Sequence, residues 1–221
     1  IEIKYPGANV EIIDFIKYLY PKMSKVMYAN FNFLVNKCSY LYNSINKITC
    51  HFCGAPMKKN LANKIDKLIK TKKIDLVIAT LPSCSQYMST YKEIKKSNIP
   101  LYTYITDIVA HEEWLTKKTD MYFVGAERTR NILRYHGIPE NKIVITGIPV
   151  KEEFKKEKIE NHKKVKEILI MGGGLGIIPN SKKIINELSK NNNYHLTIIT
   201  GKNKKLKKKL LKQFNNIEVV G

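Results

Sequence analysis

The stretch LYTYITDIVAHEEW, residues 101–114, joins a strand-like run to a cluster of polar side chains. Its first half is rich in β-branched and aromatic residues, which is typical of a buried strand. Thr106 and Asp107 end that run, and His111 and Trp114, the only tryptophan of the chain, follow closely. Because ligands of a parallel α/β sheet bind outside the carboxyl ends of its strands, the pattern predicts a binding edge here. A purely structural interpretation stays open, in which Asp107 caps a short helix, His111 lies on the surface and Trp114 fills the core.

The rest of the chain alternates between short apolar runs and segments with helical periodicity. We expect strands at residues 75–80, 101–106, 121–125, 143–146, 167–171, 195–200 and 217–220, and a further strand at residues 1–4. We expect helices within residues 10–27 (broken near Pro21), 28–48, a segment after Pro56, 86–96, 126–136, 181–191 and 202–213. This alternation predicts an α/β fold built on parallel sheets.

A charged segment divides the chain. Residues 151–166 are almost wholly charged, which is typical of a linker or an exposed helix, and the strand–helix alternation then restarts. We therefore expect two domains, residues 1–150 and residues 151–221. The first begins within a strand-like segment and the second stops after its third strand, so we expect a fragment that lacks both ends of its parent protein.

The chain is strongly basic, with a formal net charge of +20 that comes almost entirely from lysine. A basic surface favours anionic partners, either nucleic acid or anionic lipid headgroups. Arginine performs most bidentate recognition of bases, and its scarcity here disfavours sequence-specific nucleic-acid binding. A composition that is rich in Lys, Asn, Ile and Tyr would also supply the lysines without any partner.

Aromatic residues and lysines interleave across residues 15–48. Aromatic rings sit at headgroup level in membranes and lysines meet anionic lipid, so this segment predicts a membrane interface. Aromatic residues at helical spacing also occur in ordinary cores, and that alternative stays open. No apolar run in the chain approaches the ~20 residues that a membrane-spanning helix needs.

The cysteines do not predict a metal site. Cys50-His-Phe-Cys53 resembles half of a zinc knuckle, but no second pair follows it, and a structural zinc site needs four ligands. We expect free thiols in a reducing cytosol, and no bound metal.

The glycine run Gly172-Gly173-Gly174-Leu175-Gly176 is expected between a strand and a helix. Glycines allow backbone N–H groups to approach an anion closely, so the run predicts a site for a phosphate or diphosphate, unless it is a tight turn without a ligand.

Three other known motifs are excluded because one or two residues differ from the pattern that each requires. The glycine run is not a dinucleotide fingerprint, because position 177 is isoleucine and position 179 is proline. Gly201-Lys202 is followed by Asn203 and is not a Walker loop. His111-Glu112-Glu113 is not a metalloprotease motif, because position 115 is leucine.

A two-domain enzyme of this kind would bind its donor between the domains. Inverting sugar transfer needs a general base near the acceptor hydroxyl and stabilisation of the departing nucleotide diphosphate. The glycine run suits the second role, and Asp107 or His111 would assist the first.

Motifs that match those of one known enzyme family follow one another in order along nearly the whole chain. They are residues 17–22, Tyr42-Asn43, residues 75–82, T-D-x-x-x-H-x-x-W at residues 106–114, residues 120–124, residues 142–150, residues 168–176 and residues 200–203. In this combination the chain resembles the monogalactosyldiacylglycerol synthases of plastids and the bacterial processive diacylglycerol glucosyltransferases. These are inverting, UDP-sugar-dependent enzymes with the GT-B fold of two Rossmann-type domains, related to the peptidoglycan lipid N-acetylglucosaminyltransferase.

The resemblance implies roles for particular residues. Residues of an acceptor cleft in the first domain would be Pro82, Thr106, Asp107, His111 and Trp114. Residues that bind the donor diphosphate in a truncated second domain would be Gly172, Gly173, Gly174, Leu175, Gly176, Gly201 and Asn203. The donor would be UDP-glucose or UDP-galactose, the acceptor 1,2-diacylglycerol, and no cofactor would be required. The enzyme would lie on the cytoplasmic face of the membrane as a peripheral protein, bound to anionic lipid and not to nucleic acid.

The sequence departs from the family pattern at both ends. The N-terminal G-x-G-H loop, whose histidine is the usual candidate base, has no counterpart here, and neither has the downstream P-G-G motif. The resemblance therefore leaves the catalytic base unassigned, and we expect the fragment to be inactive by itself. Two alternatives stay open: an enzyme like the peptidoglycan lipid N-acetylglucosaminyltransferase, which T-D-x-x-x-H-x-x-W disfavours, and a basic, non-catalytic α/β module that binds nucleic acid.

Overall fold

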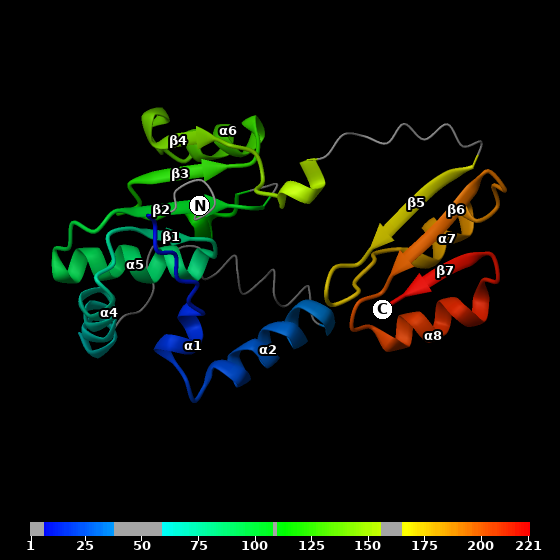
Figure 1. Ribbon diagram of the computed structural model, residues 1–221, viewed down its shortest axis with the longest axis horizontal. Helices are drawn as coiled ribbons and strands as arrows, with labels where there is room; N and C mark the ends of the chain where they lie inside the picture. Colours follow the sequence, from blue (N-terminus) through cyan, green and yellow to red (C-terminus); the bar gives the residue numbers. More distant parts are fainter. Residues whose placement is uncertain (1–6, 38–58, 108–109, 156–164) are drawn as a thin grey trace. The chain divides into compact units, whose positions relative to one another are not determined.

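A computed structural model describes residues 7–37, 59–107, 110–155 and 165–221 of the chain. The chain forms two compact units, Ile1–Phe154 and Lys155–Gly221. Each unit contains a parallel sheet with helices packed against it (Figure 1). The α/β class with parallel sheets, expected from the alternation of apolar runs and helical segments, is confirmed.

The sheet of the first unit has four strands in the order β1-β2-β3-β4. They are β1 (Val77–Ala79), β2 (Leu101–Ile105), β3 (Met121–Val124) and β4 (Ile143–Ile145), and every neighbouring pair is parallel. All carboxyl ends therefore lie along one edge of the sheet and all amino ends along the opposite edge. We call these the carboxyl edge and the amino edge of the first unit.

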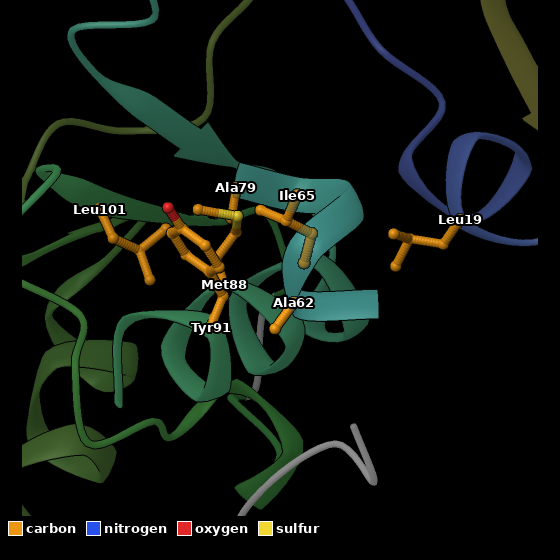
Figure 2. Close-up of a cluster of buried hydrophobic side chains, with 7 residues drawn as sticks. All are labelled: Leu19, Ala62, Ile65, Ala79, Met88, Tyr91 and Leu101. Carbon is orange, nitrogen blue, oxygen red and sulfur yellow. The ribbon is translucent and has the colours of Figure 1, made fainter. Parts of the chain in front are cut away.

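Helices α4 (Lys59–Lys72), α5 (Pro82–Lys95) and α6 (Glu127–Tyr135) provide the cover of this sheet. Side chains alternate along β2, so Leu101, Thr103 and Ile105 are buried while Tyr102 and Tyr104 face the other side. Figure 2 shows Leu101 beside Met88 and Tyr91 of α5. The pleat of one central strand thus fixes which face carries the core.

Helix α5 begins at Pro82, four residues before the expected start at residue 86. Proline has no N–H to lose and its fixed φ suits the first helical position, so a proline directly after a strand marks the start of the helix. The residue that precedes it, Leu81, has an extended backbone.

The helical segment that was expected to break near Pro21 is two helices, α1 (Phe15–Leu19) and α2 (Ser24–Lys37). The Asp14 carboxylate caps α1 by accepting from the N–H of Lys17 at 2.9 Å, and it also accepts from the Tyr28 hydroxyl of α2 at 2.6 Å. The hydrogen bond to this carboxylate raises the pKa of Tyr28 to about 12. The first part of the helix expected over residues 28–48 belongs to α2, and its remainder, like the strand expected at residues 1–4, lies outside the described residues.

The second unit has a three-stranded parallel sheet in the order β5-β6-β7. Its elements are β5 (Lys166–Met171), α7 (Ser181–Leu188), β6 (Tyr194–Ile199), α8 (Lys204–Gln213) and β7 (Ile217–Val220). Ile185, Leu196, Ile198 and Leu210 form its buried core. Short 3-10 helices occur at η1 (Glu112–Trp114), η2 (Glu140–Lys142) and η3 (Glu152–Lys155), and most of the charged segment after η3 lies outside the described residues.

Candidate functional site

The carboxyl edge of the first unit carries a carboxylate with a fixed orientation. Thr106 and Asp107 follow directly after β2 and are exposed, whereas Trp114 in η1 is only 2% exposed. The indole Nε1–H of Trp114 donates to Oδ2 of Asp107 at 2.8 Å. A buried indole N–H needs an acceptor, so this contact orients the carboxylate. Within the described chain Oδ1 of Asp107 accepts no hydrogen bond, and the exposed carboxylate can receive a ligand hydroxyl.

His111 lies on the same loop but forms no hydrogen bond with Asp107. It is exposed and precedes η1, and its backbone carbonyl accepts from the N–H of Trp114 at 3.0 Å. Its imidazole makes no hydrogen bond to any described residue. The structural interpretation is therefore correct for Trp114 as a core residue and His111 as a surface residue. It is wrong for Asp107, because η1 begins after His111 and has no side-chain cap.

Pro82 lies at the same edge, because only two residues separate the end of β1 from the start of α5. One turn further along α5, Nε2 of Gln86 donates to the backbone carbonyl of Glu113 at 2.9 Å. This bond ties η1, and with it Trp114, to the start of α5. Sequence reasoning missed Gln86. The available signal was its position one turn after a proline that begins a helix.

A cluster of hydroxyl groups lies within the first unit between α5, β2 and the loop that follows η1. Thr103 contacts Ser85 at 2.8 Å and Thr119 at 2.9 Å, and Thr119 also contacts Thr116 at 2.6 Å. Ser85, Thr103 and Thr119 are buried. Buried hydroxyl groups need partners, and here they satisfy one another and fasten the loop that holds Trp114.

The segment after β4 is fastened to the carboxyl edge by Tyr104. The Tyr104 hydroxyl donates to the Gly147 carbonyl at 2.8 Å and also contacts the Thr146 hydroxyl. The ring stacks on Phe123 of β3, with ring centroids 5.7 Å apart. The chain that leaves the first unit is thus anchored next to the end of β2 as far as Gly147.

In the second unit the glycine run packs closely against the loop after β6. Gly176 has φ +64°, and a Cβ there would lie 1.8 Å from the Thr200 carbonyl oxygen. Gly201 has φ +51°, and its Cβ would lie 2.6 Å from the carbonyl oxygen of Gly173. Lys202 N–H donates to the Gly174 carbonyl at 3.0 Å. Two of the predicted glycines are therefore required by the fold, whatever they bind.

Three successive N–H groups of the run, those of Gly173, Gly174 and Leu175, donate to no acceptor among the described residues. Gly173 and Gly174 are exposed, and a Cβ at either would meet nothing within 4 Å. Successive free N–H groups form an anion-binding concavity. The helix expected at residues 181–191 begins at Ser181 as α7, four residues after Ile177, so it does not start at the run itself. Any affinity for anions therefore comes from the loop itself.

Asn203 has a structural role beside the same loop. Its Nδ2 donates to the Gly176 carbonyl at 3.0 Å, and its Oδ1 accepts from the N–H of Leu206 at 3.0 Å as the cap of α8. Both polar atoms of the side chain are engaged. Its predicted contact with a donor stays a prediction.

The described segments contain no group of three His, Cys, Asp or Glu side chains that could hold a metal ion, and Cys50 and Cys53 lie outside them. Burial raises the pKa of the Cys84 thiol to about 12, which leaves it unreactive. In the same segments no helix is both long and apolar enough to cross a bilayer.

Two parallel-sheet units of Rossmann type in one chain are the components of the GT-B class of fold. The crystal structure of Anabaena HepE in complex with UDP-glucose superposes with a TM-score of 0.51 at 11% identity, and the match covers 73% of this chain and 51% of that chain. A likeness at this identity concerns the fold alone.

The family follows from sequence comparison. The family described as monogalactosyldiacylglycerol (MGDG) synthase matches residues 2–150. The processive diacylglycerol beta-glucosyltransferase of Bacillus cytotoxicus is 30% identical over 217 residues, 91% of this chain and 52% of the relative. The protein of that name in Bacillus cereus strain B4264 is 29% identical over 214 residues, 90% of this chain and 51% of the relative. The chain belongs to the MGDG synthase family and spans about half the length of these curated relatives.

Proposed function

We propose that the whole protein is an inverting glycosyltransferase that moves glucose or galactose from a UDP-sugar to 1,2-diacylglycerol. The observation that carries this proposal is the exposed Asp107 carboxylate, held by the indole of Trp114 at the carboxyl edge. It lies within the segment that matches the MGDG synthase family. The curated relatives are named for glucosyl transfer and the family is named for a galactolipid. UDP-glucose and UDP-galactose should therefore both be tried as donors.

In the proposed reaction the free hydroxyl of diacylglycerol attacks the anomeric carbon of the sugar as the bond to the UDP oxygen breaks. The hydroxyl proton leaves to a general base, which is not assigned here. Asp107 accepts a hydrogen bond from the acceptor hydroxyl and orients its oxygen for attack. His111, exposed on the same loop, contacts the acceptor from a second side.

The second unit would receive the departing UDP. The free N–H groups of Gly173, Gly174 and Leu175 suit diphosphate oxygens, whose negative charge grows as the glycosidic bond breaks. The proposal needs no metal and no cofactor.

Within the described part of residues 15–48, where a membrane interface is expected, α2 and the two residues before it carry both exposed apolar and exposed basic side chains. Phe15, Tyr18 and Tyr20 pack against the buried core of the first unit. By contrast, Val26 of α2 and Met23, which directly precedes this helix, are 58% and 60% exposed, and Lys25 of α2 and Lys22 before it are exposed beside them.

Phe33, two turns further along α2, is 55% exposed. Apolar side chains and lysines on one exposed helix suit the headgroup region of an anionic bilayer. We propose that α2 makes a peripheral contact with the cytoplasmic face of the membrane. Retention on anionic vesicles but not on duplex DNA, at equal salt, distinguishes this contact from nucleic-acid binding.

The test of the transfer proposal measures sugar transfer by the whole protein to vesicles that contain diacylglycerol, with UDP-glucose and UDP-galactose in separate assays. We expect Asp107→Ala to reduce kcat/KM roughly a hundredfold, because the acceptor loses its orientation. His111→Ala should reduce it less. The matched control is Asp75→Ala, which removes an exposed carboxylate at the amino edge and should leave transfer unchanged. Wild-type turnover by a folded Asp107→Ala protein would remove this residue from the site.

A further inference from the structure

A basic hollow of about 620 Å³ lies at the amino edge of the first unit, opposite Asp107. Its lining comes from the end of α5, the loop that leads into β2, the loop that leads into β3, and the residue before β4. Five lysines contribute to it: Lys92, Lys96, Lys117, Lys118 and Lys142. They are half of the ten lining residues, whereas Lys and Arg together are 39 of the 221 residues in the chain. Composition alone does not explain this share.

One of the five lysines is neutralised within the hollow. Lys92, with its side chain only 7% exposed, forms an ion pair with Oδ2 of Asp120 at 2.5 Å. The same oxygen accepts from the N–H of Leu101 at 2.7 Å. Partial burial alone would raise the pKa of Asp120, but the hydrogen bonds from Lys92 and Leu101 outweigh it and hold this pKa below its ordinary value. The pair is a structural element of the wall.

The other four lysines are not held in ion pairs, although the charge of Lys142 also acts on the Asp120 carboxylate. Lys96, Lys117, Lys118 and Lys142 form no ion pair with any described residue, and Glu93 is the one further acid in the lining. The carboxyl end of α5 adds about half a negative charge. The hollow therefore keeps a net charge of about +2.5, which is close in size to the −1.5 to −2 of a phosphate monoester at neutral pH.

The loops that carry these lysines are held in place. The N–H of Lys118 donates to the Ser89 hydroxyl at 3.1 Å, and its neighbour Thr119 belongs to the buried hydroxyl cluster. The N–H groups of Lys96 and Ser97 both donate to the Lys92 carbonyl, which ends α5. Fixed loops lower the entropy that is lost when several ammonium groups bind one ligand.

We propose that this hollow binds a phosphate-bearing anion, either a soluble phosphate monoester or a phosphate monoester in a lipid headgroup. The ligand would be held by Lys96, Lys117, Lys118 and Lys142. This site lies at the edge of the sheet that takes no part in the proposed transfer reaction, and the inference does not depend on that reaction.

The experiment titrates the 221-residue chain with inorganic phosphate by calorimetry, with total ionic strength kept constant by sodium chloride. We expect saturable binding at one site. The double variant Lys117→Gln/Lys118→Gln should weaken it at least tenfold. The matched control is Lys208→Gln/Lys209→Gln, which removes two exposed lysines from α8 and should leave the affinity unchanged. Equal weakening by the control, or no saturable binding to the wild-type chain, would overturn the proposal.

Lys96→Gly separates binding from folding. Lys96 has φ +51°, which glycine adopts without the steric cost of a side chain. This variant should therefore unfold at the same or a higher temperature while binding phosphate at least threefold more weakly. Unchanged phosphate affinity in Lys96→Gly would contradict the assignment of this lysine.

Vesicles distinguish the two sources of the phosphate. If the ligand is a lipid headgroup, vesicles with a phosphate monoester lipid should retain the chain, and inorganic phosphate should release it. Vesicles of equal charge with phosphodiester lipids should then retain less. If the ligand is soluble, Lys117→Gln/Lys118→Gln should lower phosphate affinity but leave retention on both vesicles unchanged.

Discussion

Nε1 of Trp114 lies 2.8 Å from Oδ2 of Asp107, and this hydrogen bond joins a buried side chain to an exposed one. The indole fills the core that contains Ile105 and Tyr122, while the carboxylate stands at the edge of the sheet. Packing of the core thereby sets the direction of a polar group on the surface.

Trp114→Phe tests this coupling in the whole protein. Loss of the N–H leaves the Asp107 carboxylate without its anchor, so we expect kcat/KM to fall about tenfold, mainly through KM for diacylglycerol. The smaller ring should lower the free energy of unfolding by about 1–3 kcal/mol. In an Asp107→Ala background, Trp114→Phe should still lower stability but should not reduce transfer further. Equal effects on transfer in both backgrounds would show that Trp114 does not act through Asp107.

Two alanine substitutions in the glycine run should differ in their effect on the stability of the second unit. Gly176→Ala places a methyl group against the Thr200 carbonyl at positive φ, so the second unit should lose several kcal/mol of stability or fail to fold. Gly174→Ala meets nothing within 4 Å and should change the free energy of unfolding by less than about 1 kcal/mol. Both are measured by denaturant unfolding. If the loop N–H groups bind UDP, Gly174→Ala should weaken UDP binding in the whole protein despite its normal stability.

The hydroxyl cluster should behave as one unit. Thr103→Val keeps the shape of the side chain but leaves Ser85 and Thr119 short of a partner, at a cost of about 1–2 kcal/mol. Ser85→Ala should cost a similar amount. Because the two hydroxyls contact each other at 2.8 Å, the double variant should be about 0.5–1.5 kcal/mol more stable than the sum of the single effects. Strictly additive losses in urea unfolding would argue against a shared network.

The ion pair of Asp120 predicts a dependence of stability on acid pH. The pKa of Asp120 is lower in the folded protein than in the unfolded chain, so its contribution is present above the unfolded pKa near 3.8. That contribution is lost as the pH falls below 3.8 and through the folded pKa.

Asp120→Asn should therefore lower stability at pH 7 and weaken its decrease in acid. The side chain of Asp120 is 47% exposed, so we expect a loss of about 1–2 kcal/mol rather than that of a fully buried pair. Denaturant unfolding between pH 2 and pH 7, roughly the range in which carboxyl groups titrate, measures both effects. An unchanged slope in this range would show that Asp120 does not contribute to it.

The proposed membrane contact of α2 predicts a loss of vesicle binding without a loss of stability. Val26→Asn and Phe33→Asn together remove two side chains that are more than half exposed, so the core is unaffected. Retention on vesicles with anionic lipid should fall at least tenfold, since each buried apolar side chain contributes about 1.5 kcal/mol or more. Tyr135→Asn on α6 is the control, because Tyr135 is 88% exposed and lies on another helix. Equal retention of all variants would exclude α2 as the contact.

The fold was predictable because its signals are local. A high content of β-branched and aromatic residues marks β2, and the proline at residue 82 follows a strand, so the order of elements can be read from neighbouring residues. The start of α5 was harder to place. It depends on turn geometry, which composition does not fix.

The site was predictable only in part, for a physical reason. Asp107 and Trp114 are close in sequence, so their association was visible in one motif. Gln86 and Glu113 meet across 27 residues, and the Ser85–Thr103 contact spans 18, so these pairs appear only after the strands have been paired. The basic hollow combines three separate stretches of the chain, residues 92–98, residues 117–120 and Lys142, and no sequence motif marks it.

Because β1-β2-β3-β4 are all parallel, the carboxyl edge and the amino edge of the sheet are separated by the length of a strand, which is about 16 Å for β2. Substitutions this far apart, without shared partners, combine almost independently. Variants of His111 can therefore be selected for sugar transfer, and variants of Lys117 for phosphate binding, in separate experiments. When the selected substitutions are combined in one protein, each should keep its effect.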